Sequence, residues 1–227
     1  MNLNTQSFAA LIDHTLLKPD ATKEQLERLC AEARHNGFAM IAINPYPVSM
    51  CSELLAGSEI GVGAAISFPL GQLTIDQKVN ETRSAIADGA TEIDFVVNIT
   101  ELKAGNRDYI TEEMTQIVRA CRDAQVVSKV IFENCYLTDE EKTSLANIAL
   151  EVRPDFIKTS TGFGTGGATV SDVKLMKSIV GDAVQVKAAG GIRSLNDALT
   201  FIDAGATRIG TSSGVALVEE FSKRYGS

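Results

Sequence analysis

Charged side chains interrupt four apolar segments of this chain, at positions where a soluble protein ordinarily places aliphatic residues. Asp94 lies inside TEIDFVV and Lys129 inside VVSKVIF, whereas Lys158 and Lys187 close two further segments. Burying a charge is unfavourable unless the charge is paired or has a function. These four residues are therefore the first candidates for chemistry.

The two lysines that end segments are predicted to lie side by side. Lys158 and Lys187 close consecutive segments, and the backbones of neighbouring strands run about 4.8 Å apart. Two nearby ammonium groups destabilise each other's protonated form, and burial acts in the same direction. One lysine would then be a neutral amine near neutral pH, as a Schiff-base nucleophile requires. Asp94 would pair with the lysine that stays charged and would help to move protons.

Each of these charges also has a structural interpretation. A single lysine at a strand end is ordinarily solvated, and an ion pair with Lys129 would explain Asp94 without excluding catalysis. The alternation of side chains along a strand predicts which positions share the inward face. The inward residues are predicted to be Glu92, Asp94 and Val96 on one strand and Lys129, Ile131 and Glu133 on the next.

Three glycine-rich segments follow the last three apolar segments. They span residues 159–167, 189–193 and 210–214, and the last two lead into predicted helices. Glycine lets backbone N–H groups approach phosphate oxygens, and a helix N-terminus adds free donors and a favourable dipole. One such loop alone would be an ordinary turn. Three loops on one rim favour a phosphate site.

Gly162, Gly164 and Gly167 also fit the G-x-G-x-x-G pattern of dinucleotide-binding folds. That pattern requires an acidic residue at the end of the next strand to bind the ribose. Here Asp182 precedes that strand and Lys187 ends it. The spacing argues against a dinucleotide, and no cofactor is predicted.

Histidines and cysteines are too few and too scattered for a metal or disulfide framework. His14 and His35 are the only histidines, and His35 is expected on a helix surface. The four cysteines form no C-x-x-C pair. A catalytic metal site of this kind needs several histidines, so no metal is predicted.

These candidate residues lie in a chain that alternates short apolar segments with stretches of helical period. Helix start signals lie at residues 21–24, at the capping box of residues 138–141, and at Ser194 and Asn196. Eight segments are predicted to be strands: 11–17, 39–43, 60–66, 91–97, 126–132, 154–158, 184–188 and 206–210. Eight strand–helix units close into a barrel whose chemistry lies at the C-terminal ends of the strands. Residues 1–227 are therefore predicted to form one α/β domain, a (β/α)8 TIM barrel.

Charge and hydropathy argue against two classes of partner. The formal net charge of −8 repels nucleic acid and anionic lipid. Residues 1–10 show neither the basic nor the apolar region of a signal peptide, and the apolar segments are too short to cross a bilayer. We expect a cytoplasmic protein that acts on small molecules, with no nucleic acid or membrane partner.

Four motifs together resemble the deoxyribose-phosphate aldolase family over nearly the whole chain. They are IDHTLLKP at 12–19, EIDFVVN at 92–98, FIKTSTGF at 156–163 and VKAAGGIR at 186–193. The resemblance implies a class I aldolase that reversibly cleaves 2-deoxy-D-ribose 5-phosphate to D-glyceraldehyde 3-phosphate and acetaldehyde without a metal. It also suggests a homodimer, which no residue of the chain demonstrates.

The resemblance further implies roles for particular residues. Lys158 is similar to the amine that forms the Schiff base, Lys187 to the lysine that lowers its pKa, and Asp94 to the acid of the proton relay. The phosphate site would consist of Gly162, Gly190, Gly191, Ser212 and Ser213. Asp13 and Thr161 would lie near the sugar hydroxyls.

The chain departs from the family pattern at a few positions. Ala42 stands where many members have a cysteine that reactive aldehydes modify, so good tolerance of acetaldehyde is predicted. Asn134 replaces a common threonine without an explanation from the sequence, and Cys135 is expected close enough to the site to react. A C-terminal tyrosine assists proton transfer in some members, whereas Tyr225 is expected in a frayed tail.

Two other functions stay open at this point. A lysine-dependent aldolase or transaldolase acting on a different phosphosugar would share the Schiff base and differ only in substrate. A barrel that binds a sugar phosphate without turnover is the second alternative. The pairing of Lys158 with Lys187 argues against it, because a simple binding site gains nothing from two crowded lysines.

Overall fold

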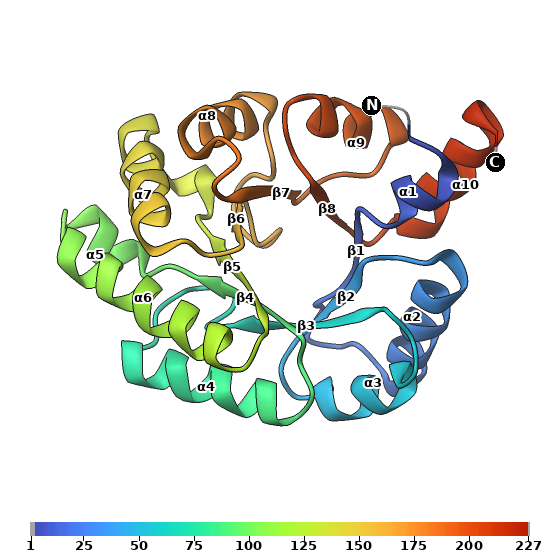
Figure 1. Ribbon diagram of the computed structural model, residues 1–227, viewed down its shortest axis with the longest axis horizontal. Coiled ribbons are helices and arrows are strands. Elements are labelled where there is room, and N and C mark those ends of the chain that lie inside the picture. The colour runs from blue at the N-terminus through green and yellow to red at the C-terminus, as the bar shows by residue number, and fades with distance from the viewer. Residues whose placement is uncertain (1–2, 227) are drawn as a thin grey trace.

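A closed ring of eight parallel strands forms the centre of the computed structural model, which describes residues 3–226 (Figure 1). The strands are β1 (Ile12–Leu16), β2 (Met40–Ile43), β3 (Gly61–Ile66), β4 (Glu92–Val96), β5 (Val127–Ile131), β6 (Phe156–Lys158), β7 (Gln185–Ala189) and β8 (Arg208–Thr211). Each strand pairs with its neighbours in sequence, and β1 pairs with β8 to close the ring. The predicted TIM barrel is confirmed: each predicted segment coincides with one strand, and only β7 and β8 run one residue further than predicted.

Helices surround this ring on the outside (Figure 1). They are α1 (Thr5–Ala9), α2 (Lys23–Asn36), α3 (Val48–Leu55), α4 (Ile75–Ala87), α5 (Ile99–Lys103), α6 (Arg107–Asp123), α7 (Asp139–Val152), α8 (Val170–Val180), α9 (Leu195–Asp203) and α10 (Gly214–Tyr225), with a 3-10 turn η1 (Asn134–Tyr136). The predicted helix starts are confirmed. Thr22 and Thr138 form capping boxes, and the Ser194 side chain caps α9, so each satisfies N–H groups that the first turn leaves free.

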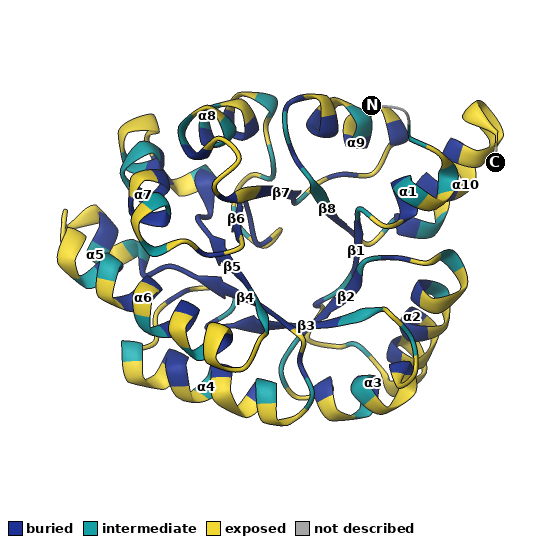
Figure 2. Cartoon of the chain, viewed as in Figure 1, coloured by how far each residue is buried: buried dark blue, intermediate teal, exposed yellow. Residues whose placement is uncertain are grey.

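The strands carry two different sets of side chains, because alternate residues point to opposite faces. The outward set is apolar and packs beneath the helices, as Ile93, Phe95 and Val130 do. Figure 2 shows the result: the strands are largely buried, whereas the helices expose their outer faces. The inward set contains charged residues, so the inside of this barrel is not an aliphatic core.

Glycine makes room for the inward side chains at two positions. A Cβ on Gly63 would lie 2.4 Å from Cε of Met40. A Cβ on Gly210 would lie 2.9 Å from Cβ of Ala189 and 3.2 Å from Cε of Lys187. Atoms so close must move apart, so the absence of a side chain at Gly210 helps to keep Lys187 in place.

The two ends of the described chain pack against each other outside the barrel (Figure 1). The ring of Phe8 in α1 stacks on that of Phe221 in α10, with centroids 4.6 Å apart. Tyr225 is the last residue of α10, and its ring lies 4.9 Å from that of Phe221. The expectation of a frayed tail is therefore wrong for Tyr225, because this aromatic contact extends the helix to that residue. None of the helices in residues 3–226 combines the length and apolar character that crossing a membrane requires.

Candidate active site

Seven charged side chains from six strands meet inside the barrel. They are Asp13, Glu92, Asp94, Lys129, Lys158, Lys187 and Arg208, and only Arg208 is more than slightly exposed. The pairing register explains the meeting, because Asp94 lies opposite Lys129 and Lys158 lies opposite Lys187. Inward-pointing residues at the same level of neighbouring strands necessarily approach one another.

Asp94 is the centre of this network. Its Oδ2 accepts hydrogen bonds from Nζ of Lys158 at 2.8 Å and from Nζ of Lys187 at 2.7 Å. Its Oδ1 accepts a hydrogen bond from Nζ of Lys129 at 2.9 Å. The structure thus brings together the residues that the sequence singled out, and the ion pair with Lys129 coexists with contacts to both other lysines.

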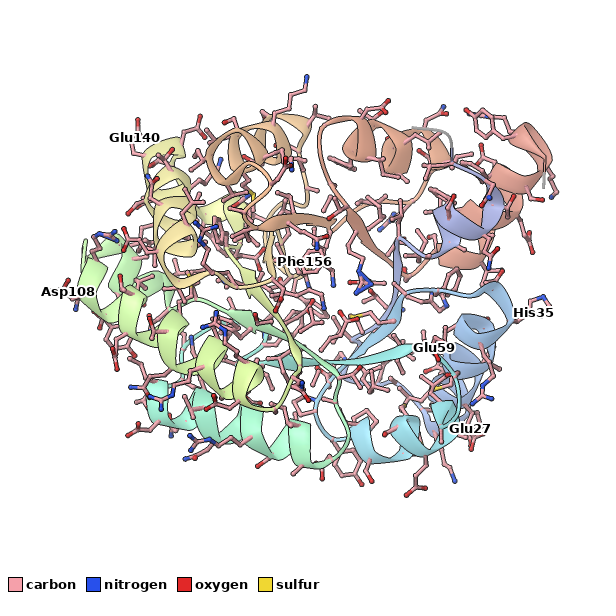
Figure 3. All side chains as sticks on the ribbon, viewed as in Figure 1. Glu27, His35, Glu59, Asp108, Glu140 and Phe156 are labelled. Atoms are coloured by element: carbon pink, nitrogen blue, oxygen red, sulfur yellow. The ribbon has the colours of Figure 1, made fainter. Side chains whose placement is uncertain are left out.

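A second group of charges lies nearer the N-terminal ends of the strands. Arg208 donates two hydrogen bonds of 2.7 Å to the carboxylate of Glu92, which also pairs with Lys129. Phe156 lies beside these cations near the middle of the barrel (Figure 3). Its ring centroid is 5.8 Å from Nζ of Lys129 and 5.6 Å from Cζ of Arg208, within cation–π range.

Burial and neighbouring charges set the protonation of these groups. Burial lowers the pKa of Lys158 to about 8, with the Lys187 ammonium adding to the effect and the Asp94 carboxylate opposing it. Burial raises the pKa of Asp94, but the surrounding lysines more than compensate and hold it well below its usual range. Burial also lowers the pKa of Lys129, but nearby carboxylates raise it to a net value above normal. Lys158 therefore loses its proton far more readily than Lys129.

A pocket of about 290 Å³ opens beside Lys158 at the C-terminal rim of the barrel. Its walls come from the loops after β1, β6, β7 and β8. Lys18 and Arg193 line it together with Lys158, and no acidic residue lines it in the described part of the chain. The pocket therefore suits an anion that reaches the amine of Lys158.

Free backbone donors surround the same pocket. Within residues 3–226, the amides of Gly162, Gly190, Gly191 and Ser212 have no hydrogen-bond partner. The helix α10 begins directly after them, and the side chain of its N-cap residue, Ser213, makes no capping hydrogen bond. Unpaired N–H groups and a helix N-terminus together form the kind of site that binds phosphate.

Comparison with known proteins gives the family. The model for DeoC/LacD family aldolases matches residues 8–219. This chain belongs to that aldolase family. It is 57% identical to the deoxyribose-phosphate aldolase of Lactobacillus acidophilus, over 99% of this chain and 94% of the relative. It is 56% identical to that of Bacteroides thetaiotaomicron, over 98% of this chain and 93% of the relative.

Solved structures of aldolases share the fold of the chain. The aldolase QR15 superposes with a TM-score of 0.91 at 39% identity, over 96% of this chain and 97% of that one. The deoxyribose phosphate aldolase from Aeropyrum pernix is described as a tetramer. It gives a TM-score of 0.90 at 33% identity, over 96% of this chain and 92% of that one.

In this aldolase, most of the residues predicted to bind substrate lie on the pocket. The lining includes Thr161, Gly162, Gly190, Gly191 and Ser212. Ser213 lies one residue beyond the lining, where its N–H donates to Oγ1 of Thr211 at 2.9 Å. Ser213 is also the N-cap residue of α10, and its contact with phosphate stays a prediction.

Asp13 lies beneath the pocket and not on its lining. Its side chain is fully buried, 2.5 Å from Nζ of Lys187 and 3.0 Å from a guanidinium nitrogen of Arg208. Neither oxygen has a partner in hydrogen-bond geometry, so these contacts act as Coulombic attraction. Asp13 therefore contacts Lys187 and not the pocket, and its place near the sugar hydroxyls stays a prediction.

Sequence reasoning missed three cations of the site. Arg208 lies within ATRIG, where a single arginine gives no sign that Glu92 faces it across the barrel. Lys18 and Arg193 lie inside family motifs, and no role was assigned to them. Their positions after β1 and β7 were the available signal, since the loops after these strands form the rim.

Asn134 and Cys135, which follow β5 and depart from the family pattern or lie beside such a departure, lie behind the pocket. Asn134 is buried, and its N–H donates to the carbonyl of Thr159 at 2.9 Å. Its side-chain amide donates to Sδ of Met176 at 3.3 Å. Cys135 is half-buried, with Sγ 3.9 Å from Oε1 of Glu133. Both residues contact the β6 loop and not the space beside Lys158.

Histidine does not contribute to the pocket. His35 lies exposed on α2 at the periphery (Figure 3), as expected. His14 is buried, and its Nε2 lies 2.8 Å from a carboxylate oxygen of Glu32. Among the described residues, no three histidine, cysteine, aspartate or glutamate side chains are arranged to hold a metal ion.

Proposed function

We propose that this aldolase reversibly cleaves 2-deoxy-D-ribose 5-phosphate to D-glyceraldehyde 3-phosphate and acetaldehyde through a Schiff base on Lys158. The observation that carries the proposal is a buried amine with a pKa of about 8 beside a cationic pocket. The names of the relatives at 57% and 56% identity supply the substrate. A nucleophilic amine near neutral pH is what Schiff-base catalysis needs.

The chemistry follows from that amine. The neutral amine of Lys158 attacks the aldehyde carbon C1 of the open-chain sugar, and the adduct takes up one proton relayed by the charged network and loses water to give a protonated Schiff base. Removal of the C3 hydroxyl proton then breaks the C2–C3 bond and releases D-glyceraldehyde 3-phosphate. The electron pair of that bond moves toward the nitrogen and forms an enamine. Protonation of C2 and hydrolysis release acetaldehyde and restore the amine.

The charges of the network support a neutral Lys158. The three carboxylates of Asp13, Glu92 and Asp94 are balanced by Lys129, Lys187 and Arg208 when Lys158 carries no proton. A proton on Lys158 leaves one excess positive charge among buried side chains, which is unfavourable. A proton bound by the network is thus readily given to a substrate atom.

We assign the proton relay to Asp94 and Lys187. Because the pKa of Asp94 is held well below its usual range, its carboxylate stays ionised and orients both lysine side chains. Lys187 lies beside Lys158 on the same oxygen of Asp94 and lowers the pKa of Lys158 by repulsion. Asp13 holds Lys187 from the opposite side.

The phosphate of the substrate would bind the free amides of the three loops. Gly162, Gly190, Gly191 and Ser212 offer N–H groups, and Ser213 places the start of α10 behind them. Thr161 lines the space between phosphate and amine, where the sugar hydroxyls would lie. Arg193 and Lys18 add positive charge at the entrance.

A cleavage assay tests the proposal. The purified chain is incubated with 2-deoxy-D-ribose 5-phosphate, and acetaldehyde and D-glyceraldehyde 3-phosphate are each measured with a reductase. We expect both products in equal amounts, none from Lys158→Leu, and normal yield from Lys174→Leu, which removes an exposed lysine of α8. Turnover of other phosphosugars only would favour a different lysine-dependent aldolase. Ligand-induced stabilisation without product would favour simple binding.

Three further properties belong to the proposal. The reaction needs no metal, so activity is expected to survive dialysis against a chelator. The protein acts in deoxyribonucleotide catabolism in the cytoplasm, and fractionation of cells followed by the same assay checks the compartment. The assembly is a homodimer, although a relative at 33% identity is described as a tetramer, and light scattering after gel filtration measures the mass directly.

A further inference from the structure

Glu133 is a buried carboxylate next to the pocket that the proposed chemistry does not use. It follows β5, is 2% exposed and lies outside the lining of the pocket beside Lys158. No lysine, arginine or histidine pairs with it among residues 3–226. A buried carboxylate without a cation is retained only where other donors satisfy it.

Apart from a weak contact from Sγ of Cys135 at 3.9 Å, those donors come from Thr161 in the β6 loop. Oε1 of Glu133 accepts the backbone N–H of Thr161 at 3.1 Å, and Oε2 accepts the hydroxyl of Thr161. The N–H of Phe163 donates to the same hydroxyl at 3.0 Å. Glu133 therefore fixes the backbone on both sides of Gly162.

The backbone around Glu133 is built to make this contact. Glu133 has φ of +56°, in the left-handed region that residues other than glycine seldom adopt. Gly164 lets the β6 loop cross over it, since a Cβ there would lie 2.7 Å from Sγ of Cys135 and 3.3 Å from Oε1 of Glu133. Such a conformation persists only where surrounding contacts hold it. Here the hydrogen bonds to Thr161 hold Glu133 in it.

We propose that Glu133 is a positioning residue for the substrate phosphate: it holds Thr161 so that the free N–H of Gly162 faces the anion site. This inference rests on the proposed function for the identity of the phosphorylated substrate. Glu133 lines the other side of the loop from Lys158, so it acts through Thr161 and Gly162 and not on the reacting carbon. The Thr161 hydroxyl already makes hydrogen bonds to Glu133 and to the N–H of Phe163, so Thr161 also holds the loop in place.

The test compares a substrate that has the phosphate with one that lacks it. Steady-state cleavage of 2-deoxy-D-ribose 5-phosphate and of 2-deoxy-D-ribose is measured for the unmodified protein, Glu133→Ala, Thr161→Val and Thr161→Ser. We expect Glu133→Ala to raise KM for the phosphorylated sugar about tenfold or more, as loss of hydrogen bonds to a charged group does. The kcat/KM for 2-deoxy-D-ribose is expected to stay within about twofold. A general structural defect would instead lower kcat/KM equally for both sugars, and that result would overturn the proposal.

Thr161 supplies the matched controls. Thr161→Ser keeps both hydrogen bonds to Glu133, so its KM for the phosphorylated sugar is expected to rise less than that of Thr161→Val, which loses the hydroxyl contact and shows part of the effect. Adding Thr161→Val to Glu133→Ala should raise KM for the phosphorylated sugar little further, because the contact between the two side chains is already gone. Fully additive effects would contradict a shared contact. If Glu133→Ala does not fold, Glu133→Gln, which keeps one acceptor oxygen, must show an intermediate KM.

Binding of inorganic phosphate separates this inference from the proposed function. If the unmodified protein cleaves neither sugar, the proposed function fails, and calorimetric titration with inorganic phosphate still tests Glu133. We expect Glu133→Ala to bind phosphate about tenfold more weakly than the unmodified protein. Equal binding by the two proteins would overturn the role of Glu133.

Discussion

Lys158 and Lys187 both donate to one oxygen of Asp94, so removing either lysine changes the protonation of the other groups. The pKa of Lys158 is lowered to about 8, mainly by burial and in addition by repulsion from Lys187. A nucleophilic amine must be unprotonated. The value of kcat/KM is therefore expected to fall as the pH drops below about 8.

Lys187→Leu changes this pH dependence in a defined direction. Loss of the second ammonium raises the pKa of Lys158, so a higher pH is needed to free the amine. We expect most of the activity to be lost and the acidic limb of the pH–rate profile to move to higher pH. The measurement is kcat/KM between pH 6 and 10, and an unchanged limb in the variant would contradict the repulsion between the lysines.

Tolerance of aldehydes is a second prediction at this scale. Ala42 is buried on β2, where other family members are expected to carry a reactive cysteine. We predict that activity declines slowly during prolonged exposure to acetaldehyde. Residual activity is followed over hours, with mass spectrometry of the cysteines. Rapid inactivation with an adduct on Cys135, relieved in Cys135→Ser, would show that a different thiol limits tolerance.

Between elements, a buried ion pair ties β4 to the helices outside it. Lys78 of α4 donates to Glu113 of α6 at 2.6 Å and to the carbonyl of Val96 at 2.7 Å, and Glu113 accepts the N–H of Asn98 at 2.9 Å. Both charged side chains are fully buried. The pair thus anchors the end of the strand that carries Asp94.

Breaking this pair on one side is predicted to be costly. Lys78→Met leaves the Glu113 carboxylate buried without a cation, and the free energy of unfolding is expected to fall by about 3–5 kcal/mol. Lys78→Met combined with Glu113→Gln should recover much of the loss, since glutamine keeps an acceptor for Asn98. Urea unfolding measures both variants, with the exposed pair partner Lys23→Met as control. A single variant as stable as the unmodified protein would refute the anchoring role.

Sequence was sufficient for the elements because their signals are local. Strand positions follow from short apolar runs, and Thr22, Thr138 and Ser194 mark helix starts through bonds within one turn. The place of Asp13 could not be predicted in the same way. Its burial beneath the pocket depends on Lys187 and Arg208, which are far away in sequence and meet it only when the barrel closes.

The candidate site was predictable in its centre and less so at its edges. Alternation and strand order bring Asp94, Lys158 and Lys187 together without any knowledge of loops. The roles of Glu133 and Arg208 depend on contacts across the barrel or between loops, which no spacing in the sequence encodes. Such contacts appear only with the three-dimensional structure.

For the molecule as a whole, burying the proposed catalytic amine lowers the free energy of unfolding. Below a pH of about 8, folding requires Lys158 to be buried with its proton, whereas the unfolded chain keeps that proton in water. Between this pH and the ordinary pKa of lysine, the unfolded state binds more protons, so the contribution of Lys158 to stability rises with pH. Active sites commonly carry such a cost.

Lys158→Met should therefore be more stable than the unmodified protein at pH 7, by about 1–3 kcal/mol. The advantage should shrink as the pH rises from 8 to 10, because the unmodified protein then buries a neutral amine. Urea unfolding of both proteins at pH 7 and pH 10 gives the difference directly. A less stable variant at pH 7, or a difference independent of pH, would contradict the depressed pKa.

Borohydride trapping with acetaldehyde shows whether Lys158 forms a Schiff base. The protein is incubated with acetaldehyde and borohydride, with and without 2-deoxy-D-ribose 5-phosphate as competitor, and its peptides are mapped by mass spectrometry. We expect one ethyl group per chain on Lys158, reduced by the competitor, with the exposed lysines unmodified. Labelling scattered over surface lysines, or absent altogether, would mean that the buried lysines are structural and that Lys158 is not the nucleophile.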